Sequence, residues 1–299
     1  MIDFHCHILP NLDDGATTID DSISMAKALA DFGYKTVCCT PHCIKGYYDL
    51  TPQKVREATL MLQADLDNAG INLELRPGTE YMLDECFSDF ADDLLPLGDT
   101  RLVLCEAPQQ AHPGVVQESL ELIIEKGFVP LVAHPERTEY FYDILSQRVA
   151  GGAWREKPED QPDPDFEGSV SPRATRHTPL AFIKGLFAPR ATRYAPRPFE
   201  AAQRPALPET CLFQANLGSF TGYYGPTVQR RAYELLKLNA YTAIASDLHD
   251  GGSASKILDH NKFVYNPFLK KLSEFDGSEA ALFKARDHSG HGGEQGELF

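Results

Sequence analysis

The chain has 299 residues, a formal net charge of −15 at pH 7, and 42% hydrophobic side chains. This length and composition can support a sizeable core within a single domain. The strong negative charge argues against nucleic acid as a partner, because affinity for a phosphate backbone comes mainly from Lys and Arg. The sequence contains no apolar segment long enough to span a bilayer and no secretory signal at its start, so we expect neither secretion nor membrane insertion.

The cysteine pattern is consistent with a reducing environment. The seven cysteines are odd in number and form no CxxC pair. Several of them (Cys38, Cys39, Cys105 and Cys211) fall inside apolar segments, where a reduced thiol behaves as a small hydrophobic side chain. We therefore predict a cytoplasmic location.

Short apolar, β-branched segments alternate along the chain with longer segments of helical periodicity. This alternation is typical of βα units arranged around a parallel sheet or barrel. We predict seven strands, each followed by a loop and a helix, near residues 1–4, 35–40, 72–76, 101–105, 129–133, 211–215 and 241–245.

Helix boundaries are marked by residues suited to capping. Thr18 followed by Asp21 resembles a capping box, and Thr51-Pro52 and Gly225-Pro226 place proline where a first helical turn accepts it. Helix ends are predicted at three glycines, which are Gly33, Gly70 and Gly127.

Residues 151–208 interrupt the alternation, because they are rich in proline, arginine and acidic residues and have little periodicity. Residues 156–167 are acidic and residues 173–204 are basic. We interpret the segment as an insertion between βα units, and we favour a disordered or loosely packed loop over a lid or partner-docking element. The prediction is therefore a single barrel domain over residues 1–287 with this insertion, followed by a low-complexity tail over residues 288–299.

Metal-capable side chains recur at the predicted carboxyl ends of the strands, where barrel enzymes keep their chemistry. Six of the seven strand ends carry such residues, which are His5, His7, Asp14, His42, Glu80, Glu106, His134, Asp247 and His249. In His-x-His and Asp-x-His on extended chain, both side chains point the same way and can reach one cation or two neighbouring cations. Nitrogen and oxygen donors without a thiolate array indicate a multinuclear hydrolytic site for Mn, Zn or Fe rather than a structural zinc.

Each of these residues also has a plainer interpretation. A single histidine more often satisfies a structural hydrogen bond, Asp14 lies in an Asp-Asp-Gly turn sequence, and Glu80 and Glu106 could be solvated charges at loop entries. Their convergence is what favours a metal site. A cysteine-nucleophile phosphatase is disfavoured because the sequence lacks a glycine-rich phosphate loop with Cys and Arg, and Walker and dinucleotide fingerprints are also missing.

Five motifs, in matching order, resemble the PHP (polymerase and histidinol phosphatase) superfamily. They are His5-Cys6-His7, Thr40-Pro41-His42, Pro77-Gly78-Thr79-Glu80, His134-Pro135-Glu136-Arg137 and Ser246-Asp247-Leu248-His249. Within that superfamily, residues 2–15, the HPER sequence at 134–137 and Asn-Leu-Gly-Ser at 216–219 resemble the bacterial manganese-dependent protein tyrosine phosphatases of capsule and exopolysaccharide operons. The resemblance implies an α/β fold, a distorted seven-unit βα barrel of the PHP type, with its metal site at the C-terminal ends of the strands.

The resemblance also implies three metal ions. It assigns His5, His7, Glu80 and Asp247 to the first, Glu80 as a bridge with Glu106 and His134 to the second, and Asp14, His42 and His249 to the third. Manganese is the expected ion, with two or three bound per chain, and Zn, Fe or Co are alternatives. Arg137 is expected to hold the phosphate by forked hydrogen bonds while an activated water attacks phosphorus in line.

One departure concerns the second phosphate-binding residue. The family commonly has an arginine a few residues beyond the last Asp-x-His, where this chain reads Asp-Gly-Gly-Ser-Ala-Ser-Lys at 250–256. Phosphate recognition would then be weaker or fall to Lys256 or to the insertion.

The implied function is hydrolysis of phosphotyrosine on a bacterial tyrosine kinase that regulates capsular or exopolysaccharide synthesis, with this tyrosine-phosphorylated protein as the partner. A small-molecule phosphatase of the histidinol-phosphatase type would use the same metals, and pocket depth would separate the two. A nuclease is disfavoured by the net charge, and a non-catalytic regulatory metal-binding protein is disfavoured by the complete ligand set. The sequence leaves the oligomeric state open.

Overall fold

The computed structural model describes residues 1–110, 112–149, 207–208 and 210–290. Its strands are β1 (Ile2–Cys6), β2 (Thr36–Cys39), β3 (His42–Cys43), β4 (Glu74–Pro77), β5 (Glu80–Met82), β6 (Leu102–Glu106), β7 (Val129–Ala133), β8 (Leu212–Asn216) and β9 (Ala243–Ala245). The first helices are α1 (Ile19–Phe32), α2 (Pro52–Asn68), η1 (Phe87–Asp89), α3 (Pro113–Glu125), η2 (Pro135–Arg137) and α4 (Glu139–Val149). The later helices are α5 (Leu217–Thr221), α6 (Pro226–Lys237), α7 (Ala254–Ile257), α8 (His260–Val264), α9 (Pro267–Leu272) and α10 (Glu279–Gly290).

The described residues belong to one compact unit. Apart from residues 207 and 208, the predicted insertion at 151–208 lies outside the described residues, as does most of the predicted tail. Helix α10 extends to Gly290, so residues 288–290 of that tail belong to a helix. No helix in the described ranges combines the length and apolar character needed to cross a bilayer.

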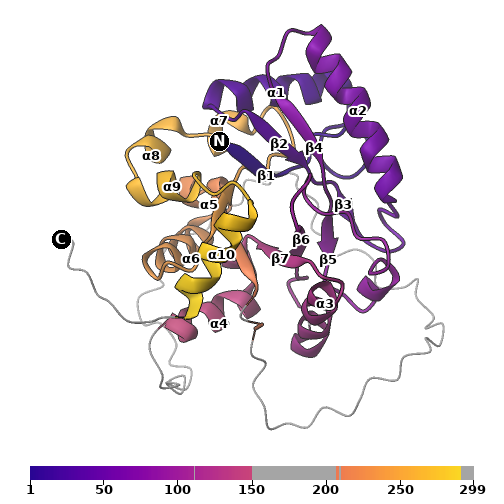
Figure 1. Ribbon diagram of the computed structural model, residues 1–299. Helices are drawn as coiled ribbons and strands as arrows, with labels where there is room; N and C mark the ends of the chain where they lie inside the picture. The colour runs from indigo at the N-terminus through magenta and orange to yellow at the C-terminus, as the bar shows by residue number, and fades with distance from the viewer. Residues whose placement is uncertain (111, 150–206, 209, 291–299) are drawn as a thin grey trace, which may run out of the picture. The chain divides into compact units, whose positions relative to one another are not determined.

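All strand pairs within the two sheets are parallel (Figure 1). The order is β1-β2-β4 in the three-stranded sheet and β3-β5-β6-β7-β8-β9 in the six-stranded sheet. Helices α1 and α2 lie beside the first sheet, where α2 packs on β4, and α3 packs on β7 in the second. The prediction of an α/β fold with parallel strands is confirmed.

Two short strands, β3 and β5, follow the second and third predicted strands and were not predicted themselves. Thr40-Pro41 separates β2 from β3, and Gly78-Thr79 separates β4 from β5, so β2 and β4 pair in one sheet while β3 and β5 pair in the other. Pro41 has no N–H to donate to a strand ladder. A Cβ at Gly78 would lie 2.6 Å from Leu97 Cδ2, so a larger residue here would require the Leu97 side chain to shift.

Backbone hydrogen bonds connect the end of β9 to the end of β1. The Asp247 N–H donates to the His5 carbonyl oxygen at 2.8 Å, and the His7 N–H donates to the Leu248 carbonyl oxygen at 3.0 Å. A parallel bridge also joins Cys6 and Leu248. The described strands nevertheless form two sheets, and no single closed barrel is detected among them.

The predicted helix boundaries are confirmed. Thr18 Oγ1 accepts a hydrogen bond from the Asp21 N–H at 3.1 Å, and Pro52 and Pro226 are the first residues of α2 and α6. The chain leaves α1 through Gly33, whose φ of 115° is a left-handed conformation that glycine adopts without steric cost.

The strands are buried on both faces, which explains their apolar sequences. Along β6, Val103 and Cys105 contribute to the larger of two hydrophobic clusters, and the alternate residues Leu102 and Leu104 contribute to the smaller one. The smaller cluster also contains Leu282 of α10. A sheet packed this way is a rigid support for polar side chains at its strand ends.

Candidate metal centre

The structure brings all nine predicted metal-capable side chains together. They fall into four overlapping groups of three or four residues, and the ligand atoms within each group lie within 4.8 Å of one another. The groups are His7, Asp14, His42 and His249; His5, His134 and Asp247; His5, His7 and Glu80; and His42, Glu80 and Glu106.

Glu80 lies at the middle of this cluster, at the start of β5, and its side chain is fully buried. Its Oε2 lies 3.1 Å from His5 Nε2, 3.3 Å from His7 Nε2 and 3.1 Å from His42 Nδ1. Its Oε1 lies 3.3 Å from His134 Nε2. One carboxylate therefore faces four imidazole rings, which is the arrangement required of a bridging ligand.

The His42 and His134 rings connect Glu80 to the carboxylate at the end of β6. Glu106 Oε1 lies 3.2 Å from His42 Nδ1, and Glu106 Oε2 lies 3.9 Å from His134 Nε2. Glu106 is 15% exposed, so this part of the cluster approaches the surface.

A second buried carboxylate, Asp247, follows β9. Its Oδ1 lies 3.2 Å from His5 Nε2 and 3.5 Å from His7 Nε2. Its Oδ2 accepts hydrogen bonds from Arg137 Nη1 at 2.8 Å and from Asn216 Nδ2 at 2.6 Å. The Oδ1 atom of Asp247 thus faces the cluster, while the hydrogen bonds to Oδ2 fix the orientation of the carboxylate.

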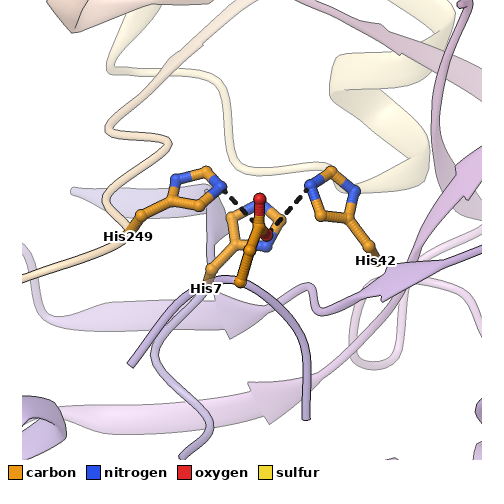
Figure 2. A group of neighbouring side chains, drawn as sticks. His7, His42 and His249 are labelled. Carbon is orange, nitrogen blue, oxygen red and sulfur yellow. Dashed lines mark ion pairs between the residues drawn. The ribbon is translucent and has the colours of Figure 1, made fainter. Parts of the chain in front are cut away.

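The most exposed part of the cluster is formed by Asp14, His42 and His249. Asp14 Oδ1 lies 3.4 Å from His42 Nε2 and 3.7 Å from His249 Nε2, and the Asp14 side chain is 57% exposed. The His7 ring stacks on the His249 ring with 3.9 Å between centroids. Figure 2 shows His42 and His249 on either side of His7, with their dashed ion pairs directed at one carboxylate.

Hydrogen bonds on the outer side of three rings fix which nitrogen carries the proton. His7 Nδ1 lies 2.6 Å from Asp13 Oδ2, His5 Nδ1 lies 3.0 Å from Gln214 Oε1, and His249 Nδ1 lies 3.1 Å from the Asp247 carbonyl oxygen. These oxygens can only accept, because Gln214 Nε2 donates to the Ala215 carbonyl oxygen. The Nδ1 atoms must therefore donate, which leaves the Nε2 lone pair of each ring directed into the cluster.

These constraints fit divalent cations. The Nε2 atoms of His5 and His7 lie 3.0 Å apart, so two lone pairs face each other beside two carboxylates when both rings are neutral, and a cation among them would relieve this. Buried Glu80 Oε1 and His42 Nδ1 have ion-pair neighbours at 3.1–3.3 Å, but none of these contacts has hydrogen-bond geometry. Buried polar atoms normally have a partner. The donor set contains nitrogen and oxygen only, as expected for Mn, Zn or Fe in a hydrolytic site.

The electrostatics of the side chains keep the carboxylates ionised. Burial raises the pKa of Glu80, but the charges of His5 and His42 outweigh burial and hold that pKa well below its usual value. Asp247 behaves in the same way: burial raises its pKa, but the His5 and Arg137 charges and a hydrogen bond from His7 help to hold it well below its usual value. Burial and the charge of neighbouring His7 lower the pKa of His249, which favours the neutral ring that a ligand requires.

Arg137 lies in η2, at the edge of the cluster. Its guanidinium pairs with Asp247 through Nη1 and lies over the Tyr224 ring, 4.4 Å from the centroid, and the side chain is 30% exposed. Glu136 anchors this turn, because its buried carboxylate accepts hydrogen bonds from the Asn216 N–H at 3.1 Å and the Ser219 hydroxyl at 2.7 Å. The exposed side of the guanidinium is thus held beside the cluster.

Three further residues of the site were not assigned a role from the sequence: Asp13, Gln214 and Tyr224. Asp13 and Gln214 orient ligand rings, and the Tyr224 hydroxyl lies 3.2 Å from Asp247 Oδ2. Asp13 could have been noticed as a second acid beside Asp14, but Gln214 and Tyr224 carry no spacing signal. Lys256, proposed as a substitute phosphate ligand, lies exposed on α7, and no residue of the described cluster pairs with it.

A parallel α/β protein with several imidazoles and carboxylates converging at its strand ends has the donor groups of a metal-binding protein. Residues 1–149 match the family model described as "Capsular polysaccharide synthesis, CpsB/CapC". This region is therefore similar to the CpsB/CapC family, and the resemblance predicted from the motifs is confirmed.

Named relatives agree with this assignment. Tyrosine-protein phosphatase YwqE of Bacillus subtilis (strain 168) is 42% identical over 139 residues, which are 46% of this chain and 55% of the relative. Tyrosine-protein phosphatase CpsB of Streptococcus pneumoniae is 28% identical over 147 residues, 48% of this chain and 59% of the relative. The chain thus aligns with less than two thirds of the length of these relatives.

A solved structure extends the similarity to almost the whole chain. It comes from work described as "Crystal structures of YwqE from Bacillus subtilis and CpsB from Streptococcus pneumoniae, unique metal-dependent tyrosine phosphatases". The TM-score is 0.64 at 26% sequence identity, covering 97% of this chain and 92% of the other.

Proposed function

We propose that this protein is a metal-dependent protein tyrosine phosphatase that acts on a bacterial tyrosine kinase regulating capsular or exopolysaccharide synthesis. The observation that carries the proposal is the convergence of nine nitrogen and oxygen donors around buried Glu80, with Arg137 at the edge of the cluster. The names of the relatives support the choice of phosphotyrosine as the substrate.

The proposed ligand sets overlap with the four groups of neighbouring side chains but do not coincide with them, since His134 is grouped with His5 and Asp247. His5, His7, Glu80 and Asp247 would hold one ion, Glu80, Glu106 and His134 a second, and Asp14, His42 and His249 a third. The short distances from His7 to the Asp14 group and from His42 to Glu80 support shared or neighbouring ions rather than isolated ones. Manganese is the proposed ion, with two or three per chain.

When bound, divalent cations supply positive charge for the phosphoryl oxygens and an activated water for attack on phosphorus. The role proposed for Arg137 is to bind the phosphate, because its guanidinium is anchored by Asp247 through one nitrogen and remains partly exposed. Tyr224 and Asp247 would keep that guanidinium in place while the ester binds.

An exposed edge favours a peptide over a metabolite. Asp14 is 57% exposed and His249 is 29% exposed, so one side of the cluster is open. An enclosed pocket would suit a small molecule such as histidinol phosphate better. The protein tyrosine phosphatase is therefore preferred over the small-molecule enzyme.

The finer features of the architecture are also proposals. The bonds between β1 and β9 support a distorted seven-unit barrel assembled from the two sheets, within one domain over residues 1–287 that carries the insertion at 151–208 and the tail at 288–299. Six of the seven cysteines are buried and Cys86 is exposed, a pattern that supports a cytoplasmic location.

The test is phosphate release from a tyrosine-phosphorylated peptide and from histidinol phosphate, measured in parallel with Mn and after chelation. We expect metal-dependent turnover of the peptide, loss of turnover in His134→Ala, and no loss in His260→Ala, a surface histidine on α8. Preference for histidinol phosphate would support the small-molecule enzyme, and turnover of neither substrate would favour a non-catalytic metal-binding protein.

A further inference from the structure

The segment between β3 and α2 places two tyrosines beside the cluster. The Tyr48 ring lies nearly parallel to the His42 ring, at 16° with 6.2 Å between centroids, and Tyr47 lies 6.4 Å from Tyr48. Tyr48 is half-buried, while Tyr47 is 52% exposed. The two rings therefore extend from a candidate metal ligand toward solvent, next to exposed Asp14.

This segment is held in a fixed shape. The Tyr48 N–H donates to the Ile44 carbonyl oxygen at 2.8 Å, and the Ile44 N–H donates back to the Tyr48 carbonyl oxygen at 3.2 Å. Gly46, with a φ of 78°, makes the turn between them. Lys45 Nζ lies 3.4 Å from Asp89 Oδ2, which ties the segment to η1.

Tyr48 packs against the larger hydrophobic cluster and is half-buried, so the ring is held in place while part of it stays accessible. By contrast, Tyr224, the other tyrosine at the cluster, is already engaged by Arg137 and Asp247.

We propose that Tyr48 and Tyr47 form an aryl-binding subsite that receives the phenyl ring of an aryl phosphate ester whose phosphate lies at the cluster. This inference rests on the proposed function and specifies how that site selects its substrate. The ring of a phosphotyrosine begins one bond beyond the ester oxygen, and aromatic rings pair at centroid separations of about 4.5–7 Å. An alkyl phosphate, such as phosphoserine, has no ring to place against Tyr48.

The subsite is tested by binding rather than turnover. The probes are a peptide containing the non-hydrolysable phosphonomethyl-phenylalanine and the same peptide with an alkyl phosphonate side chain, both titrated into Mn-loaded protein. In Tyr48→Leu we expect the Kd of the aryl probe to rise about 3- to 10-fold, with a smaller rise in Tyr47→Ala. The Kd of the alkyl probe should stay at its wild-type value.

Two control variants isolate the ring from other effects. Tyr48→Phe keeps the aromatic face and should restore wild-type binding of the aryl probe, and Tyr265→Ala removes a tyrosine that is 82% exposed on the chain after α8 and should change neither Kd. An equal rise for both probes, or no rise for either, would overturn the subsite. The Kd values can be measured even if the protein has no phosphatase activity. A protein that binds the probes but releases no phosphate would count against the proposed function, while the Kd comparison between aryl and alkyl probes would still test the subsite.

Discussion

Replacing Asp13 by asparagine tests whether the outer hydrogen bonds set the chemistry of the cluster. Asp13 accepts three N–H groups: His7 Nδ1–H at 2.6 Å and the His42 N–H at 2.9 Å on Oδ2, and the Gly15 N–H at 2.9 Å on Oδ1. Since both carboxylate oxygens accept, the amide NH₂ of asparagine must face an N–H donor in either orientation. The charge that holds the His7 proton on Nδ1 is lost as well.

The expected consequence is weaker metal binding. Losing an outer carboxylate partner of a ligand histidine typically lowers metal affinity about 10- to 100-fold. Isothermal titration with Mn should therefore give a Kd for Asp13→Asn higher by that factor, while Asp31→Asn, a surface change on α1, should match the wild type. A folded Asp13→Asn protein with wild-type Mn affinity would refute the assignment of the His7 proton.

Three other outcomes are expected. Mn at about 100 times its Kd should stabilise the folded protein by about 2.7 kcal/mol. Chelation should therefore lower the Tm measured by calorimetry. An unchanged Tm would argue that the folded protein does not bind the metal. Leu120→Ala, on the buried face of α3, should lower the unfolding free energy measured in urea by about 2–5 kcal/mol, and a loss below 1 kcal/mol would mean that the core is less tightly packed. In the native protein, a thiol reagent should label only exposed Cys86 among the seven cysteines. The other six are buried, and burial raises the pKa of Cys39 and Cys43 to about 12. Rapid labelling of more than one cysteine would contradict this burial.

Much of the fold could be predicted because the strands are buried on both faces. Burial forces a continuous apolar sequence in each strand, and the polar residue that follows marks the strand end. Placing His5, Glu80 and Asp247 at one edge of the sheets then requires only that parallel strands end on the same side. The division into two sheets was not predicted, because β3 and β5 have only two and three residues and such short strands carry no periodic signal.

The remaining details depend on side-chain direction in three dimensions. Asp13 and Asp14 are adjacent acids in one turn, yet the Asp13 side chain is fully buried against His7 while Asp14 is 57% exposed. Only the folded turn decides which acid points inward. Likewise β8, the one predicted strand without a metal-capable residue at its end, carries Gln214 and Asn216, whose amides orient His5 and Asp247.

Backbone conformation shows how the fold prepares the cluster. His134 and Asp247 both have left-handed conformations, with φ of 33° and 50°, which cost non-glycine residues about 1–2 kcal/mol each. Each is held by a strand-end hydrogen bond: the His134 N–H donates to the Gln214 carbonyl oxygen at 2.9 Å, and the Asp247 N–H donates to the His5 carbonyl oxygen at 2.8 Å. Packing of β7 on β8 and of β9 beside β1 therefore offsets the strain and aims both side chains before any ion binds. Substituting either side chain should accordingly weaken metal binding far more than it weakens folding, because the strained backbone is fixed by the strands rather than by the metal.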